Sequence, residues 1–267
     1  MKPTSLVVAV ALLAAACSPT STSSDGGPGS MVTVVRVLDG DSLIISIDGT
    51  EEEVRLLGIN TPERDECFAP QARERTARLA AGQIRLDAGG RDQFGRLLGY
   101  VFTADATLIN RQLIDEGLAI ALSTDHPRRA EFKAGEETAF LNGLGRWEAA
   151  ACGPADPARI SITEMEPNAP GDDSQNPNGE WVELTNQGPA LVRMTGWALQ
   201  DESSSHRFAF PSDFVLPPAG QVRIFSGCGE DGPETLYWCG SGAIWSNGGD
   251  TAYLLDGSGN VVDRLAF

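Results

Sequence analysis

Residues 54–63 read VRLLGINTPE, and this stretch does most to define the fold. Its aliphatic start predicts a strand, and its polar end predicts a turn directly after that strand. A second motif, DGDS at 39–42, follows a β-rich run earlier in the chain, and a third, DQFGR at 92–96, opens a later strand. Taken singly, each motif is an ordinary turn or a surface charge, so their significance depends on their order.

The region from residue 31 to residue 152 mixes short strands with helices, a pattern typical of a compact α+β barrel. An Asp-Gly pair at 48–49 predicts a hairpin, and Thr107 is placed to cap the second helix. The predicted strands cover 32–38, 43–47, 53–59, 84–86 and 97–102, and the predicted helices cover 70–81, 107–116 and 127–144.

The chain changes character after a linker at 153–159. Helical periodicity disappears beyond it, and short β-rich runs alternate with Gly, Pro, Asn and Asp turns, which indicates an all-β sandwich. The predicted strands cover 160–164, 180–186, 192–199, 207–210, 221–225, 252–256 and 261–266. We therefore predict a second domain over 160–267.

The first 17 residues resemble a bacterial lipoprotein signal peptide. The apolar run at 6–16 is too short for a membrane-spanning helix, which needs about 20 residues. The AAAC sequence that ends the segment resembles a lipobox, so we expect Cys17 to be lipidated and to anchor an exported protein to the outer membrane. An ordinary signal peptide, with secretion, is the alternative. The polar residues 18–30 predict a flexible tether.

Four cysteines remain after Cys17, namely Cys67, Cys152, Cys228 and Cys239. An even number in an exported chain favours two disulfides, although three pairings are possible. Proximity in sequence favours Cys228 with Cys239, which leaves Cys67 with Cys152.

The composition limits the kinds of function that the chain can have. With 20 Lys and Arg against 37 Asp and Glu, the net charge of −17 excludes a uniform positive field for binding nucleic acid. Any contact with DNA or RNA must use a local cluster or a bound metal. The two histidines, His126 and His206, exclude a histidine-rich zinc cluster.

In their order along the chain, the motifs resemble those of the thermonuclease (staphylococcal nuclease-like) family. The resemblance covers 31–152 and rests on 39–42, Arg55, 58–63, 92–96, 108–119 and 145–147. It implies an OB-fold barrel and calcium-dependent hydrolysis of phosphodiester bonds in DNA and RNA.

The resemblance also implies roles for single residues. Arg55 and Arg96 match the two catalytic arginines of the family, whose guanidinium groups stabilise negative charge on the phosphate. Glu63 matches the carboxylate proposed as the general base for the attacking water. Gln93 and Phe94 stand where Lys and Tyr often hold the substrate phosphate, so we expect weaker substrate binding.

The implied cofactor is Ca²⁺, a hard cation that binds oxygen ligands and needs neither His nor Cys. Asp41 matches the first ligand of the family, and the carbonyl of Thr61 matches another. Asn60 stands where the family normally has Asp, which removes one negative charge from the site. We therefore expect a lower affinity or an altered metal preference.

The second domain resembles the lamin-tail family, an immunoglobulin-like sandwich. The matching residues lie at 162–168, 179–186, 195–201, 210–211 and 216–220. Such domains often accompany exported bacterial hydrolases, which suggests tethering or substrate placement, although the sequence does not identify a ligand. Trp181 and Trp197 fit a sandwich core better than a stacking pair, and the loop at 171–179 fits a solvated loop better than a calcium site.

These observations favour a monomeric, exported and membrane-anchored calcium-dependent nuclease. The alternatives are a catalytically inactive OB-fold that only binds nucleic acid, which the change at Asn60 favours, and an envelope adhesion module in which the sandwich is the functional part.

Overall fold

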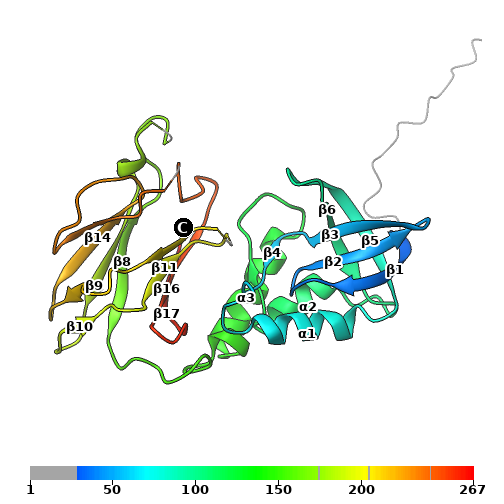
Figure 1. The fold of residues 1–267 in the computed structure, drawn as a ribbon, viewed down its shortest axis with the longest axis horizontal. Coiled ribbons are helices and arrows are strands. Elements are labelled where there is room, and N and C mark those ends of the chain that lie inside the picture. Colours follow the sequence, from blue (N-terminus) through cyan, green and yellow to red (C-terminus); the bar gives the residue numbers. More distant parts are fainter. Residues whose placement is uncertain (1–28, 174, 204, 241) are drawn as a thin grey trace, which may run out of the picture.

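The computed structural model describes residues 29–173, 175–203, 205–240 and 242–267. They form a barrel with helices and a β-sandwich, which lie side by side along the longest axis of the molecule (Figure 1). The predicted signal peptide, Cys17 and most of the predicted tether lie outside the described residues. Within the described part, no helix has the length and apolar character needed to cross a membrane.

Five strands close the barrel in the order β1-β2-β3-β6-β5. They are β1 (Ser30–Val37), β2 (Ser42–Ile47), β3 (Thr50–Leu56), β5 (Gln83–Arg91) and β6 (Leu97–Phe102). Asp48 and Gly49 connect β2 to β3 with φ angles of 50° and 83°, as a two-residue turn of type I′ requires. The parallel pair β3–β6 belongs to the closed barrel, so the predicted α+β barrel and its first hairpin are confirmed.

A short antiparallel pair and three helices complete the first domain. The pair joins β4 (Ile59–Asn60) to β7 (Ile120–Ala121). The helices are α1 (Ala69–Leu79), α2 (Ile109–Asp115) and α3 (Arg129–Leu141), followed by the 3-10 turn η1 (Gly145–Trp147). The helices gather below the barrel and beside β4, as Figure 1 shows. All three helices lie close to their predicted positions.

Asn110 fixes α2 to the barrel. Its side chain is fully buried, and its Oδ1 accepts a hydrogen bond from the backbone N–H of Val101 at 3.0 Å. Its Nδ2 donates to the carbonyls of Leu57 (2.9 Å) and Gly99 (3.3 Å). Buried polar groups need such partners, so this asparagine joins α2 to strand β6 and to the residue that follows β3.

Several details of the predicted elements were wrong. The predicted strands 53–59 and 192–199 are each interrupted, since residues 57–58 and 194–197 lie outside strands. Thr107 does not cap α2, because the N-cap residue is Leu108 and no side chain caps the helix. Strand β5 is longer than the predicted 84–86, because its pairing with β6 shifts register between Ala88 and Gly90 and then continues. Gly89 is the extra residue between these paired positions, so it forms a bulge in the strand.

The second domain packs two four-stranded sheets face to face. One sheet has the order β12 (Arg207–Ala209), β11 (Ala198–Gln200), β16 (Thr251–Leu255), β17 (Val261–Ala266). The other has the order β15 (Thr235–Tyr237), β14 (Gln221–Phe225), β9 (Trp181–Asn186), β8 (Ile160–Glu166), and a separate pair joins β10 (Val192–Arg193) to β13 (Val215–Leu216). The 3-10 turn η2 (Pro177–Gly179) precedes β9.

The two tryptophans singled out in the sequence do not form a stacking pair. Trp197 is 1% exposed and lies in the sandwich core, as we expected. Trp181 is half-buried, and the guanidinium of Arg223 lies 4.0 Å from the centre of its ring.

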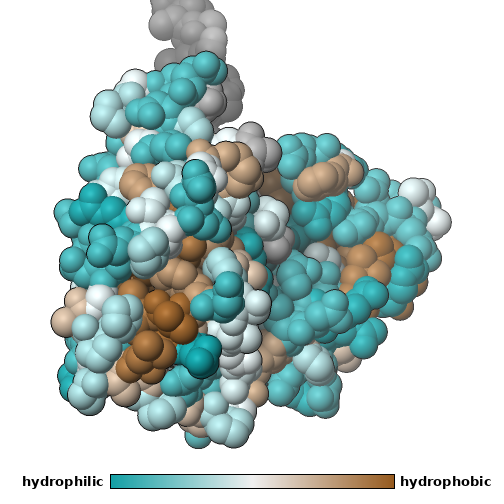
Figure 2. Space-filling model, turned by 60° about the vertical axis from the view of Figure 1, so that its left-hand side comes forward, coloured by the Kyte–Doolittle hydropathy of each residue, from teal (hydrophilic) through white to brown (hydrophobic). Residues whose placement is uncertain are grey.

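The barrel and the sandwich share a buried apolar contact, which we call the seam. Ile120 and Trp147 of the first domain pack in one cluster with Ala198, Tyr253 and Leu255 of the second. The ring centres of Trp147 and Tyr253 are 6.0 Å apart. The seam removes apolar side chains of both domains from water. The outer face shown in Figure 2 is, by contrast, mainly hydrophilic, with a few hydrophobic patches.

Both favoured disulfides are formed. Cys67 pairs with Cys152 across 85 residues, and Cys228 pairs with Cys239 across 11 residues. The first disulfide connects the segment before α1 to the end of the barrel domain, whereas the second closes a local loop of the sandwich.

The two disulfides should contribute unequally to stability. Because the entropy lost by the unfolded chain grows with loop length, replacing Cys67 and Cys152 together by serine should lower the free energy of unfolding by about 4.5 kcal/mol, against about 3 kcal/mol for Cys228 and Cys239. Urea unfolding of the two double variants measures the difference. An equal or reversed order would contradict this assignment.

Candidate active site

Four of the predicted site residues meet at one end of the barrel. Asp41 directly precedes β2, Arg55 lies near the end of β3, and Asn60 ends β4. Antiparallel pairing of β2 with β3 places Ser42 opposite Arg55. Asp41, the residue before Ser42, is therefore brought next to the arginine by the pairing of the two strands. The backbone N–H of Thr61 donates to Asp41 Oδ2 at 2.7 Å, which ties the turn after β4 to the same carboxylate.

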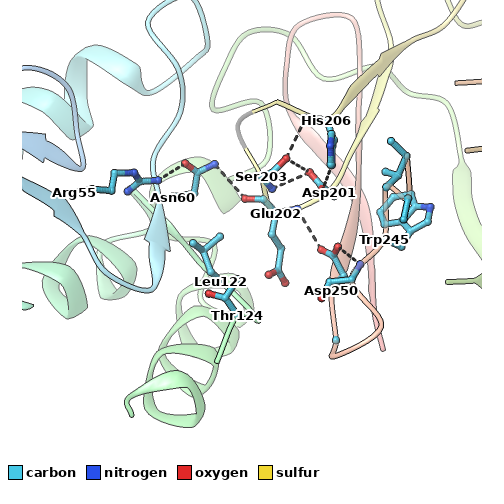
Figure 3. A pocket seen from close by; sticks show the side chains of 14 residues that line it. Arg55, Asn60, Leu122, Thr124, Asp201, Glu202, Ser203, His206, Trp245 and Asp250 are labelled. Atoms are coloured by element: carbon cyan, nitrogen blue, oxygen red, sulfur yellow. Dashed lines mark hydrogen bonds and ion pairs between the residues drawn. The ribbon is translucent and has the colours of Figure 1, made fainter. Parts of the chain in front are cut away.

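The guanidinium of Arg55 lies between the two predicted metal-binding side chains. One nitrogen is 2.8 Å from Asp41 Oδ2 and donates to the carbonyl of Ile59 at 3.0 Å. The other donates to Asn60 Oδ1 at 2.9 Å. Figure 3 shows Arg55 and Asn60 joined in this way. Asp41 and Asn60 therefore direct oxygen atoms at the same positive group.

Arg96 is held by the turn that contains its own motif. Asp92 Oδ1 accepts hydrogen bonds from the backbone N–H groups of Phe94 (2.9 Å) and Arg96 (3.0 Å). Asp92 Oδ2 accepts from Arg96 Nε at 2.7 Å. A second guanidinium nitrogen lies 3.9 Å from Glu53, which shares a face of β3 with Arg55 because alternate residues of a strand point the same way.

Glu63 lies on the exposed turn after Thr61. Its backbone N–H donates to Glu66 Oε2 at 3.0 Å, and its carboxylate forms no hydrogen bond or ion pair with any residue that the structure describes. Glu63 and Arg96 thus make no direct contact with the cluster of Asp41, Arg55, Asn60 and Thr61.

Burial has a clear electrostatic effect on Asp41, which is 5% exposed. Loss of hydration raises the pKa of this carboxyl to about 6, although the Arg55 guanidinium opposes the shift. Asp41 therefore titrates near neutral pH, unlike an exposed aspartate.

The donor set suits an oxygen-preferring cation. Asp41 and Asn60 offer a carboxylate and an amide oxygen, which are the donor types that Ca²⁺ prefers, and both oxygens contact the Arg55 guanidinium in this structure. Only one of these side chains is charged, and the described residues contain no group of three or more His, Cys, Asp or Glu that could hold a metal ion. The residues fit Ca²⁺ by donor type, with one anionic side chain.

The second domain forms part of this site, which the sequence did not predict. Arg55 and Asn60 line a cavity of about 500 Å³ together with residues of the sandwich. These include Asp201, Glu202, Ser203, His206, Trp245 and Asp250 (Figure 3). The hydrogen bond that the ring of His206 donates to the Asp201 carboxylate raises the pKa of His206 above its ordinary value. In the sequence, the one signal of this arrangement is the unusual Asn60.

Comparisons with known proteins agree with this geometry. Residues 53–149 match the family described as Staphylococcal nuclease homologue, and residues 154–267 match the Lamin Tail Domain. Micrococcal nuclease of Shigella flexneri is 32% identical over 124 residues, which cover 43% of this chain and 71% of that protein. The chain belongs to the staphylococcal nuclease homologue family. The resemblances to the nuclease family and to the lamin-tail family are confirmed, and the resemblance of the first 17 residues to a lipoprotein signal peptide stays a prediction.

Two further relatives of this chain are named as a thermonuclease and as a succinoglycan biosynthesis protein. Thermonuclease of Staphylococcus intermedius is 38% identical over 112 residues, which cover 39% of this chain and 66% of that protein. Succinoglycan biosynthesis protein ExoI of Rhizobium meliloti is 34% identical over 125 residues, with 42% and 62% covered. The matched part of the chain thus spans somewhat less than two thirds of the length of these two relatives.

Calcium binding at Asp41 should weaken in acid. The cation needs the carboxylate form, and Asp41 takes up a proton as the pH falls through about 6. Apparent affinity at pH 5 should therefore be about tenfold lower than at pH 7.5. Isothermal titration calorimetry at the two pH values measures this, with Asp41→Asn as a control that binds weakly at both. Equal affinity at both values would contradict the assignment.

Proposed function

We propose that this protein is a nuclease that hydrolyses phosphodiester bonds of DNA, RNA or both, with Ca²⁺ as its cofactor. The convergence of Asp41, Arg55, Asn60 and Thr61 at one strand end is the observation that carries the proposal. Two of the three relatives described above are named as nucleases, one a thermonuclease and one a micrococcal nuclease.

Each side chain of the site would have its own role in the reaction. Arg55 and Arg96 carry permanent charges and would neutralise the phosphate oxygens as negative charge develops on them. Glu63 has an unpaired, solvated carboxylate, so it is free to accept a proton from the attacking water. Asp41, Asn60 and the Thr61 carbonyl would hold Ca²⁺, which supplies further neutralisation of the phosphate when bound.

We also infer that the protein acts outside the cytoplasm, as a monomer anchored through lipidated Cys17. Two disulfides in a chain of this size fit an oxidising compartment. The apolar run at 6–16, followed by Cys17, fits a lipoprotein signal. Radiolabelled palmitate incorporated by the natural chain but not by Cys17→Ser would support the anchor, and its absence from both would exclude it.

The nuclease proposal is tested by degradation of single-stranded DNA and RNA with purified residues 29–267. Cleavage should require Ca²⁺ and stop in EDTA. Glu63→Gln keeps the shape of the side chain but removes its basicity, so the rate should fall by about 10²–10⁴-fold. Asp65→Asn, a change to an exposed carboxylate on the same turn, is the matched control and should leave the rate unchanged.

Two results would overturn this function. Binding of DNA without cleavage at any divalent ion would favour the inactive binding module. Neither binding nor cleavage would favour the envelope adhesion module, in which the lamin-tail domain is the functional part.

A further inference from the structure

Glu202 of the lamin-tail domain is buried against the nuclease domain. It lies in the turn after β11 and is 5% exposed. Ser123 of the nuclease domain donates two hydrogen bonds to the Glu202 carboxylate, one from its hydroxyl at 2.8 Å and one from its backbone N–H. Lys133, also in the nuclease domain, forms an ion pair with the same carboxylate. The hydroxyl of Thr251 donates at 2.7 Å. A buried carboxylate is stable only with such partners. The contacts of Glu202 with Ser123 and Lys133 therefore hold the turn after β11 against the nuclease domain.

The backbone carbonyl of the same residue reaches the candidate metal site. Asn60 Nδ2 donates to the Glu202 carbonyl at 3.2 Å, and Asn60 Oδ1 accepts from Arg55 at 2.9 Å (Figure 3). A guanidinium only donates and a carbonyl only accepts, so one orientation of the Asn60 amide satisfies both neighbours. That orientation directs the amide oxygen to the site and the N–H₂ group to the second domain.

This contact explains why the chain departs from the resembled family at position 60. The carboxylate of an aspartate would place an oxygen beside the Glu202 carbonyl, with no hydrogen between the two acceptors. An asparagine supplies the missing donor but removes one negative charge. The unusual residue and the seam are therefore parts of one arrangement.

We propose that Glu202 is a positioning residue, which orients Asn60 for the nuclease site by holding its own backbone carbonyl against the amide. The proposal rests on the proposed function and gives the lamin-tail domain a part in it. In this proposal the second domain supplies no catalytic group. It orients the Asn60 amide so that Oδ1, and not Nδ2, faces the cation. In E202A the turn loses its ion pair and hydrogen bonds to the nuclease domain, so the backbone carbonyl at position 202 is no longer held beside Asn60 and Arg55 alone orients the amide. The amide then turns more freely, and an N–H group turned to the cation cannot bind it.

A double-mutant cycle separates this role from simple structural support. Ca²⁺ affinity is measured by calorimetry for the natural chain, E202A, N60D and the double variant. Loss of a group that supports a metal ligand typically weakens affinity about 10–100-fold, and we expect this for E202A. In the N60D background, E202A should change affinity less than about twofold, because a carboxylate binds through either oxygen and needs no orientation. Equal losses in both backgrounds, or no loss in either, would overturn the proposal.

Two further variants control for damage to the seam. Glu137→Ala removes another ion pair across the seam, that with Arg264, and has no contact with Asn60. It should leave Ca²⁺ affinity unchanged, and a loss as large as that of E202A would overturn the proposal. Ser123→Ala removes one donor to Glu202, so it should weaken Ca²⁺ binding in the same direction by a smaller factor, which keeps the test valid if E202A does not fold.

A readout without metal distinguishes this proposal from the nuclease proposal. In NMR spectra, the side-chain N–H₂ of Asn60 should exchange slowly with solvent in the natural chain and rapidly in E202A. If this difference is seen in a protein that cleaves no nucleic acid, the nuclease function fails while the positioning stands. Equal exchange in both chains would overturn the positioning even if cleavage occurs.

Discussion

The ion pair between Arg55 and Asp41 is the interaction on which the site depends. Burying two charges is costly, and that cost is recovered only where each charge also has hydrogen-bond partners. Thr61 supplies one for Asp41, while Ile59 and Asn60 supply them for Arg55. The pair therefore holds the ends of three strand segments in one arrangement before any substrate or cation is present.

The seam extends this constraint to the second domain. Tyr253 is fully buried in the shared apolar cluster, and its hydroxyl donates to the buried Glu136 at 2.8 Å. Burial raises the pKa of Glu136, with Lys133 opposing the shift. Apolar packing and paired buried charges occur together at this boundary, so the two domains are joined by a packed interface as well as by the linker.

The nuclease-domain part of the site could be predicted because its residues lie in local motifs of strand and turn. The order of these motifs resembles that of the nuclease family, and this resemblance singled out Asp41, Arg55 and Asn60. The contact between Asn60 and Glu202 joins residues 142 positions apart and has no periodicity or turn signal, so its one trace in the sequence is the unusual Asn60, and nothing there points to Glu202. The end of β5 was missed for a related reason, since residues 87–91 continue the strand by pairing with β6.

The amide at position 60 also connects the two domains through a single side chain. Its oxygen accepts from Arg55 of the nuclease domain, and its N–H₂ group donates to the backbone carbonyl of Glu202 in the lamin-tail domain. A cut at the linker would take this acceptor away from a residue of the candidate site. The boundary between the two domains in the sequence is therefore not a boundary between their hydrogen-bond networks.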